Sequence, residues 1–283
     1  MAHKPLIGFI GQGYIGKNYA DDFEKRGYAA VRYALPKRYR ANKEKIKDCD
    51  IVFIAVPTPT TPKGFDGSVV SDAISLVGKG KVAVIKSTVL PGTTEIFQKR
   101  YPDRIILYSP EFLSEATAAY DAARPFSNIV GMPKNTPKNR VAAKAVLRVL
   151  PKAPFTLVCA AVEAELIKYT HNASAYTQIV TFNMLYELTE SFGAKWPRIH
   201  EALLADPLIC NRYANPLHKG GRGAGGHCFI KDFAALRALY GKSVKDKEGL
   251  AALSAFEEKN KELLRSTKKD LNLLDGVYGA KKH

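Results

Sequence analysis

The stretch that decides the fold is PLIGFIGQGYIG, residues 5–16. Its first half is an apolar run without polar alternation, which is typical of a strand covered on both faces of a parallel sheet. Three glycines follow and open a helical pattern over residues 14–26. Because glycine has no Cβ, such a turn can close and let its backbone approach a pyrophosphate at the helix N-terminus. We predict dinucleotide binding, with a purely structural turn as the alternative; the expected cofactor contacts are Gly11, Gly13, Tyr14, Ile15 and Gly16.

The same pattern recurs through the first half of the chain. Helical patterns, for example at residues 69–76 and 93–101, lie between further apolar runs. Alternating strands and helices predict an α/β domain, a Rossmann-like doubly wound parallel sheet over residues 1–154. The further buried strands are expected at residues 29–34, 51–56, 81–86, 104–108 and 128–132.

Beyond Pro154 the character of the sequence changes. One last strand-like run at residues 155–159 precedes a long helical pattern over residues 162–191. Residues 155–283 therefore predict a second, mainly helical domain that ends in a long helix. Its other helices are expected at residues 196–204, 232–240 and 248–274.

Composition excludes several classes of protein. The 283 residues, 46% of them hydrophobic and 25% charged, are ordinary for a globular chain of two domains. No apolar run approaches the roughly 20 residues that a membrane helix needs, and the N-terminal run is too short for a signal peptide. We therefore expect a cytoplasmic protein. The four cysteines form no C-x-x-C pair, so neither a disulfide framework nor a metal site is expected.

The formal net charge of +16 has three explanations: nucleic-acid binding, an anionic small substrate, or a solvated basic surface. The basic residues are dispersed, with one denser run over residues 32–47. Because no nucleic-acid-binding motif accompanies them, a nucleic-acid partner is not the favoured interpretation.

The end of the second predicted strand bears on the choice of dinucleotide. Its last residues, Val31-Arg32-Tyr33-Ala34, include no carboxylate that could accept hydrogen bonds from a ribose 2′-hydroxyl. Arg32, Lys37 and Arg38 could instead meet the 2′-phosphate of NADP, or could be solvated charges. We expect Arg32 at the cofactor and leave NAD or NADP open.

Polar loops follow the third, fourth and fifth predicted strands, at the edge where such sheets bind ligands. They are Val56-Pro57-Thr58-Pro59, the stretch from Ser87 to Thr93, and Pro110-Glu111-Phe112-Leu113-Ser114-Glu115. The third loop would bring two carboxylates to one crevice. Each loop taken alone could equally be turn chemistry.

Two patterns in the second half carry candidate chemistry. Lys168 and Asn172 share one helix face and could offer an ammonium and an amide to a developing oxyanion, although such pairs are usually solvated. The stretch GGHCFIKD, residues 225–232, presents Cys228 at the start of a predicted helix. A helix N-terminus and a nearby cation lower the pKa of a thiol, so we predict a nucleophile rather than an inert small residue.

Taken in order, these fragments resemble the UDP-glucose/GDP-mannose dehydrogenase family. The resemblance spans nearly the whole chain and implies oxidation of the C6 alcohol of a nucleotide sugar to a carboxylate. It implies two hydride transfers to two NAD molecules, through a covalent thioester on a cysteine. The matching pieces are residues 11–16, 56–59, 87–93, 110–115, 165–172 and 225–232.

The resemblance assigns a role to each matching residue. Cys228 would form the thiohemiacetal and then the thioester, while Lys168 and Asn172 would stabilise the oxyanion. Glu111 would assist hydrolysis, Thr88 would hold the water, and Asp232 would position that water or tune the nearby lysines. Further cofactor contacts are expected from Val56, Pro57, Thr58, Thr88, Glu115 and Lys231. Substrate contacts are expected from Phe112, Leu113, Lys168, Asn172, Tyr213 and Gly225.

The sequence departs from the family pattern where substrate is recognised. The family usually carries a third domain that binds the nucleotide of the substrate. We expect this chain to lack that domain and to depend on a partner chain for it. Leu208 stands where the family has a substrate-binding arginine. The glycine loop is longer than in the family, and Ala224 replaces an aromatic residue. The residues expected to react thus match the family pattern better than the residues expected to recognise the substrate.

The resemblance also implies a homodimer, because the helical domain of this family dimerises through its long helix. Two other interpretations remain open. One is a two-domain dehydrogenase of the 3-hydroxyacid type with a smaller anionic substrate, for which Cys228 would be dispensable. The other is a non-catalytic binding protein that keeps the dinucleotide fold.

Overall fold

Seven strands form the sheet that carries the first half of the chain, in the order β2-β1-β3-β6-β7-β8-β9. The computed structural model describes residues 4–280, which divide into two compact units. The sheet belongs to unit 1, which comprises residues 4–58 and 66–168. Its strands are β1 (Ile7–Ile10), β2 (Ala30–Tyr33), β3 (Ile51–Ile54), β6 (Val82–Ile85), β7 (Ile105–Tyr108), β8 (Ser127–Met132) and β9 (Phe155–Ala160).

The predicted doubly wound sheet is confirmed for its first five strands. β1 pairs in parallel with β2 on one side and β3 on the other, with Ile7 opposite Ala30 and Ile51. Every residue of β1 and β3 is buried, as their unbroken apolar runs predict. Such burial on both faces needs helices on both sides of the sheet.

The sheet is mostly parallel, as predicted, but it departs from the parallel arrangement at one edge. β8 runs antiparallel to β7, with Tyr108 opposite Gly131, and β9 then runs parallel to β8. An antiparallel neighbour needs no crossover helix over a sheet face, so the segment 109–126 can return the chain directly. A buried strand has the same apolar pattern in either direction, and the pattern therefore carries no sign of this reversal.

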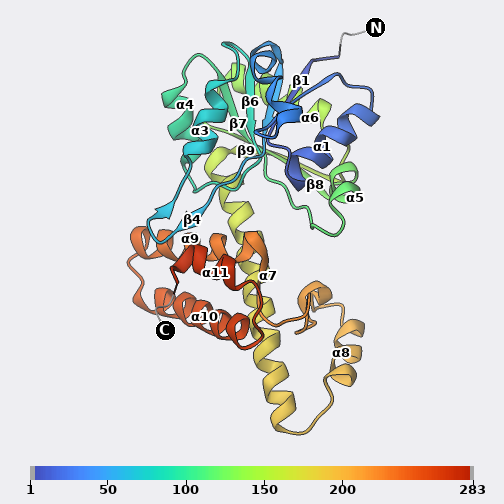
Figure 1. Cartoon of the computed structure of the whole chain (residues 1–283), viewed down its shortest axis with the longest axis vertical. Helices are drawn as coiled ribbons and strands as arrows, with labels where there is room; N and C mark the ends of the chain where they lie inside the picture. Colours follow the sequence, from blue (N-terminus) through green and yellow to red (C-terminus); the bar gives the residue numbers. More distant parts are fainter. Residues whose placement is uncertain (1–3, 281–283) are drawn as a thin grey trace. The chain divides into compact units, whose positions relative to one another are not determined.

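Helices cover both faces of the sheet. Residues of α1, α5 and α6 share one apolar cluster with β1, β3 and β7, and Figure 1 shows α3 and α4 on the other face. In this cluster the rings of Phe9, Phe23 and Phe53 lie 5.3–5.4 Å apart. The helices are α1 (Tyr14–Lys25), α2 (Lys37–Arg40), α3 (Ser68–Ser75), α4 (Thr93–Arg100), α5 (Ala118–Ala123) and α6 (Pro137–Val149), with a 3-10 helix η1 (Lys43–Asp48).

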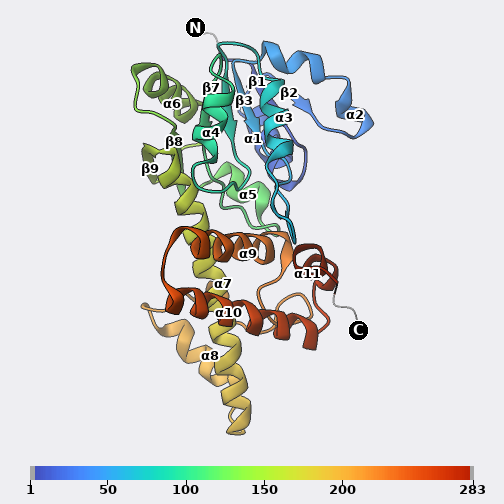
Figure 2. The same cartoon turned by 90° about the vertical axis from the view of Figure 1, so that its left-hand side faces the viewer.

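Unit 2 comprises residues 59–65 and 169–280 and is mainly helical, as predicted. Around Tyr176, Val180 and Phe233 it packs α7, α9 and α10 together, with the rings of Tyr176 and Phe233 stacked at 3.8 Å (Figure 2). Its elements are the hairpin β4 (Thr60–Thr61) and β5 (Gly64–Phe65), most of α7 (Ala161–Ser191), α8 (Trp196–Ala205), the 3-10 helix η2 (Asn211–Tyr213), α9 (Gly226–Ser243), α10 (Lys247–Ser266) and α11 (Leu271–Tyr278).

Two predicted helices of unit 2 differ from the structure. The expected single helix over 248–274 is two helices, because Lys268 and Asp270 between them adopt positive φ angles of 54° and 52°. Neither glycine nor proline marks this break. The helix expected at 232–240 begins at Gly226, so that Cys228 lies inside its first turn.

The division between the two units falls within α7, between Lys168 and Tyr169. β9 joins the sheet of unit 1, although the sequence places residues 155–159 in the helical domain. The domain boundary between residues 154 and 155 stays a prediction. Within residues 4–280, no helix is both long and apolar enough to cross a membrane.

Candidate active site

The glycine turn between β1 and α1 has the shape that a pyrophosphate site needs. Gly11 has φ +91°, and a Cβ there would lie 2.1 Å from the carbonyl oxygen of Ala55. A Cβ on Gly16 would lie 2.0 Å from the Gly11 oxygen, so the turn itself requires both glycines. At Gly13, by contrast, a Cβ would meet no described atom within 4 Å. The absent side chain there leaves room for a ligand, as a cofactor pyrophosphate requires.

The N-terminus of α1 is also open to an anion. Gly13 is its N-cap residue, and no side chain in the described part of the chain caps it. The first amides of a helix have no partner inside the helix and carry the positive end of its dipole. One of these amides belongs to Ile15, where the sequence predicts cofactor contact, and the residues present therefore fit a dinucleotide phosphate.

Arg32 forms ion pairs with two acidic residues of the same unit. Its Nη1 donates to Asp21 Oδ1 at 2.7 Å, while Nε and Nη2 donate to the two carboxylate oxygens of Glu24 at 2.9 and 2.6 Å. Both acids lie on α1, and only 15% of the Arg32 side chain is exposed. Its charge is therefore neutralised by two carboxylates, and its contact with a cofactor stays a prediction.

The loops after β3 and β6 meet through Ser87. Its Oγ accepts a hydrogen bond from Val56 N at 2.9 Å and donates to Val56 O at 2.7 Å. Of the neighbouring candidates, Thr58 and Thr88 are buried and Pro57 is exposed. The two predicted polar loops thus lie side by side at the ligand-binding edge of the sheet.

Glu111 and Lys168 form a buried ion pair in unit 1. Lys168 Nζ lies 3.1 Å from Glu111 Oε1 and donates to the Glu111 carbonyl oxygen at 2.7 Å. Glu111 Oε2 accepts from Leu113 N at 2.8 Å, and the Phe112 ring lies 5.3 Å from the ammonium. The structure thereby joins the loop after β7 to α7, 57 residues further along the chain. Glu115, in the same loop, is exposed.

Glu165 attaches the loop after β6 to the same helix, and sequence reasoning assigned it no role. Its carboxylate accepts hydrogen bonds from Gly92 N, Thr94 N and Thr94 Oγ1 at 2.6, 2.9 and 2.6 Å. Burial raises the pKa of Glu165, although these three donors favour the carboxylate. The loop that carries Thr88 is therefore tied to α7 one turn before Lys168.

Lys86 is a functional candidate that the sequence analysis missed. Only 3% of it is exposed, and its Nζ donates to Ser109 O and Ser109 Oγ at 3.2 Å and to Pro110 O at 3.4 Å. The ammonium also lies 4.5 Å from the centroid of the Tyr19 ring. Lys86 thus holds the two residues before Glu111. A lysine that ends an otherwise apolar predicted strand is the signal that could have revealed it.

Burial lowers the pKa of Lys86 to about 7, with Glu111 opposing this shift and Lys168 adding to it. Between that pH and the unfolded value of about 10.4, only the unfolded chain keeps the proton, so this residue makes stability rise with pH. We expect the free energy of unfolding of the wild type, relative to Lys86→Met, to grow by about 1.4 kcal/mol per pH unit above pH 7.

Urea unfolding of both proteins at several pH values from 7 to 9 measures this difference. Lys79→Met is the matched control, since the side chain of Lys79 is 83% exposed. Parallel pH profiles for wild type and Lys86→Met would show that Lys86 keeps its proton in the folded protein.

In unit 2, Asp232 joins two other candidate residues. Only 2% exposed, it accepts a hydrogen bond from Asn172 Nδ2 at 2.7 Å and forms an ion pair with Lys231. Cys228 lies on the same helix, one turn before Asp232. The structure therefore gathers Asn172, Cys228, Lys231 and Asp232 in unit 2, while Glu111 and Lys168 pair in unit 1. Lys168 and Asn172 occupy successive turns of α7.

The first turn of α9 depends on Gly225. A Cβ there would lie 2.1 Å from Asp270 Oδ2, the atom that accepts a hydrogen bond from Gly226 N at 2.7 Å. None of the four cysteines, all within the described residues, forms a disulfide, so Cys228 is a thiol. Of the predicted substrate contacts nearby, Tyr213 is partly buried and its ring meets that of Phe229 edge-on at 6.1 Å.

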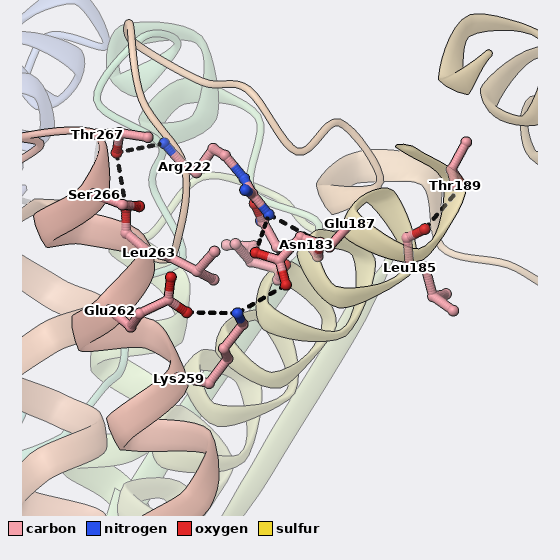
Figure 3. A network of polar contacts seen from close by, with 11 residues as sticks. Asn183, Leu185, Glu187, Thr189, Arg222, Lys259, Glu262, Leu263, Ser266 and Thr267 are labelled. Carbon is pink, nitrogen blue, oxygen red and sulfur yellow. Dashed lines mark hydrogen bonds and ion pairs between the residues drawn. The ribbon is translucent and has the colours of Figure 1, made fainter. Parts of the chain in front are cut away.

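The glycine loop before Cys228 is fixed to α7 and α10 by long-range polar contacts. Arg222 Nε donates to Asn183 Oδ1 at 2.9 Å, and its Nη2 donates to Asn183 O and Glu187 Oε1 at 3.0 and 2.8 Å (Figure 3). Lys259 of α10 pairs with the other Glu187 oxygen at 2.8 Å. Asn260, 1% exposed, bonds both the N–H and the carbonyl of Ala224. The longer loop is therefore well anchored.

Two family models match this chain. The NAD-binding domain of the UDP-glucose/GDP-mannose dehydrogenase family matches residues 29–149, and the central domain of the same family matches residues 162–262. A solved UDP-glucose dehydrogenase from the archaeon Pyrobaculum islandicum superposes with a TM-score of 0.78 at 27% identity, over 93% of this chain and 69% of that one.

Curated relatives carry similar names. A UDP-glucose 6-dehydrogenase of Haloferax volcanii is 28% identical over 282 residues, covering 82% of this chain and 64% of the relative. One of Rickettsia typhi is 31% identical over 242 residues, covering 77% of this chain and 51% of the relative. The chain thus spans about half to two-thirds of the length of these relatives.

Proposed function

Because the chain belongs to the UDP-glucose/GDP-mannose dehydrogenase family, we propose that it oxidises the C6 alcohol of a nucleotide sugar to a carboxylate. The observation that carries this proposal is the buried Asp232, which binds Asn172 and Lys231 and lies on α9 one helical turn after Cys228. A single oxidation of an alcohol needs no nucleophile. A thiol among buried donors suits a reaction that captures an aldehyde and oxidises it again.

The cofactor belongs to the glycine turn of unit 1. Gly13, Tyr14 and Ile15 would hold its pyrophosphate through their backbone, and the ends of β3 and β6 would meet its nicotinamide half. When bound, the nicotinamide supplies the acceptor for a hydride. Two such acceptors are consumed for each carboxylate formed.

Residues of this chain would hold and stabilise the substrate between the two hydride losses. C6 loses a hydride and its hydroxyl loses a proton, giving an aldehyde, and the Cys228 thiolate then adds to C6. Lys168 Nζ and Asn172 Nδ2 would donate to the oxygen of this thiohemiacetal, since both are hydrogen-bond donors with fixed partners. Loss of a second hydride from C6 leaves a thioester on Cys228.

Hydrolysis would then release the product. A water held by Thr88 adds to the thioester carbon while Glu111 takes its proton, the C–S bond breaks, and the thiol returns. Glu111 suits this role because its carboxylate is buried and fixed by Lys168 and Leu113 N. Asp232 would hold Asn172 and Lys231 in place throughout.

The test follows reduction of NAD or NADP with UDP-glucose, GDP-mannose and UDP-N-acetylmannosamine, while product carboxylate is quantified by mass spectrometry. We expect two reduced cofactors for each carboxylate. One reduced cofactor for each oxidised substrate would instead indicate a dehydrogenase of the 3-hydroxyacid type. Cofactor binding without turnover of any nucleotide sugar would contradict the proposed activity.

We also propose a homodimer formed through α7. Three exposed apolar residues, Met184, Leu185 and Leu188, lie on the last turns of this helix, and Phe192, 80% exposed, directly follows its end. Light scattering is expected to give a molar mass near twice 31.1 kDa. A combined Leu188→Glu and Phe192→Glu variant should give the monomer mass, and Val141→Glu, on α6, is the control. A wild-type mass near 31.1 kDa would contradict the proposal.

A further inference from the structure

Cofactor choice depends on the residues that follow β2. In a doubly wound fold the turn after the first strand holds the pyrophosphate, and the end of the second strand meets the adenosine ribose. Here Gly11 N donates to Tyr33 O at 2.9 Å, and Ile10 lies opposite Tyr33 in the sheet. The end of β2 is therefore directly beside the glycine turn, and the segment after Tyr33 is placed to meet the ribose.

This segment holds no carboxylate for a 2′-hydroxyl. The first acidic residue after Tyr33 is Glu44, eleven positions later and within η1. Before β2 in the sequence, Asp21 and Glu24 of α1 form ion pairs with Arg32, and Asp21 also pairs with Lys17 at 2.7 Å. The acidic contact by which NAD is ordinarily recognised has no counterpart at this position.

The same segment carries uncompensated positive charge. Lys37, Arg38 and Arg40 form the short helix α2, and Lys37 and Arg38 are exposed. Within residues 4–280 neither of these two forms an ion pair, in contrast to Arg32. Arg40 Nε donates to Leu35 O at 2.9 Å, which closes the turn, and the Arg38 guanidinium lies 4.6 Å from the Tyr39 ring. Adjacent like charges repel each other, and a bound dianion would offset this repulsion.

We infer that unit 1 recognises the 2′-phosphate of NADP through Lys37 and Arg38, and not through Arg32. An arginine near the end of the second strand is the feature that accommodates this phosphate in such folds. Arg32 is excluded because three of its nitrogens already donate to two carboxylates. The inference rests on the proposed function in one respect, namely that a nicotinamide dinucleotide binds at the glycine turn.

A binding experiment without turnover tests it. The probes are ADP-ribose and 2′-phospho-ADP-ribose, which differ only by the phosphate, and isothermal titration calorimetry gives both dissociation constants. At 0.15 M salt, where the Debye length is about 8 Å, charges far from the ligand contribute little. We expect the wild type to bind the phosphorylated probe at least tenfold more tightly.

The combined Lys37→Ala and Arg38→Ala variant should lose this preference while it binds ADP-ribose as the wild type does. The matched control is the combined Lys43→Ala and Lys47→Ala variant, which removes the same charge from η1, within the same basic run. It should keep the preference.

Three outcomes would overturn the inference. Binding of ADP-ribose as tightly as 2′-phospho-ADP-ribose, or more tightly, would assign the site to NAD and leave the proposed function intact. If the test and control variants lost the preference for 2′-phospho-ADP-ribose equally, net charge alone would explain that preference. Binding of neither probe would overturn the cofactor site itself, and with it the proposed function.

Discussion

Cys228→Ala is expected to stop the reaction before the carboxylate. Without the thiol, the aldehyde formed by the first oxidation has no nucleophile to hold it for a second hydride loss. Reduced cofactor should fall from two to at most one for each substrate consumed, and the steady-state rate should fall by about a thousandfold or more, as for other nucleophile deletions. Stoichiometric counting of reduced cofactor against product, with mass spectrometry of the product, measures both effects.

Cys210→Ala is the matched control, since Cys210 is an exposed thiol of the same unit. It should keep full activity and the ratio of two. If Cys228→Ala still formed carboxylate with two reduced cofactors, the thioester mechanism would be wrong. A direct check is alkylation by iodoacetamide, which should label Cys228 in the free protein and be slowed by bound substrate.

Lys168→Met is expected to lose both stability and activity. Glu111 is 3% exposed, and removing its partner would leave a buried charge uncompensated at a cost of about 3–5 kcal/mol in the free energy of unfolding. Loss of a donor to the oxyanion should in addition lower kcat by about 10²–10³-fold. Urea unfolding and steady-state kinetics measure the two effects separately.

The combined Lys168→Met and Glu111→Gln variant separates the loss of stability from the loss of activity. With both charges removed, no buried ion lacks its partner, so stability should return to within about 1–2 kcal/mol of the wild type. Activity should stay at the low level of the single variant. Because Glu111 is itself proposed to take the proton of the attacking water, recovery of kcat together with stability would contradict a catalytic role for both residues. Lys138→Met, an exposed lysine on α6, is the control.

Local signals were sufficient for much of the fold. The apolar run before Gly11 and the glycine turn itself predict β1 and the start of α1, because burial on both faces and a tight turn each leave a mark within a few residues. The long helix over 162–191 is likewise confirmed to within one residue. The reversal at β8 and the break at residues 267–270 left no such mark, since neither changes the local pattern of apolar residues.

By itself, then, the sequence determined the Rossmann-like sheet, the helical second unit and the identity of most candidate residues. Only the tertiary structure decided their partners. Glu165 meets Thr94 across 71 residues, Lys86 meets Ser109 across 23, and Arg32 meets Glu24 on a different element. The physical reason is the distance along the sequence over which each effect acts, because backbone preferences and burial periodicity act only between near neighbours. The compensation of a buried charge depends on whichever donor or acceptor the fold brings within about 3 Å.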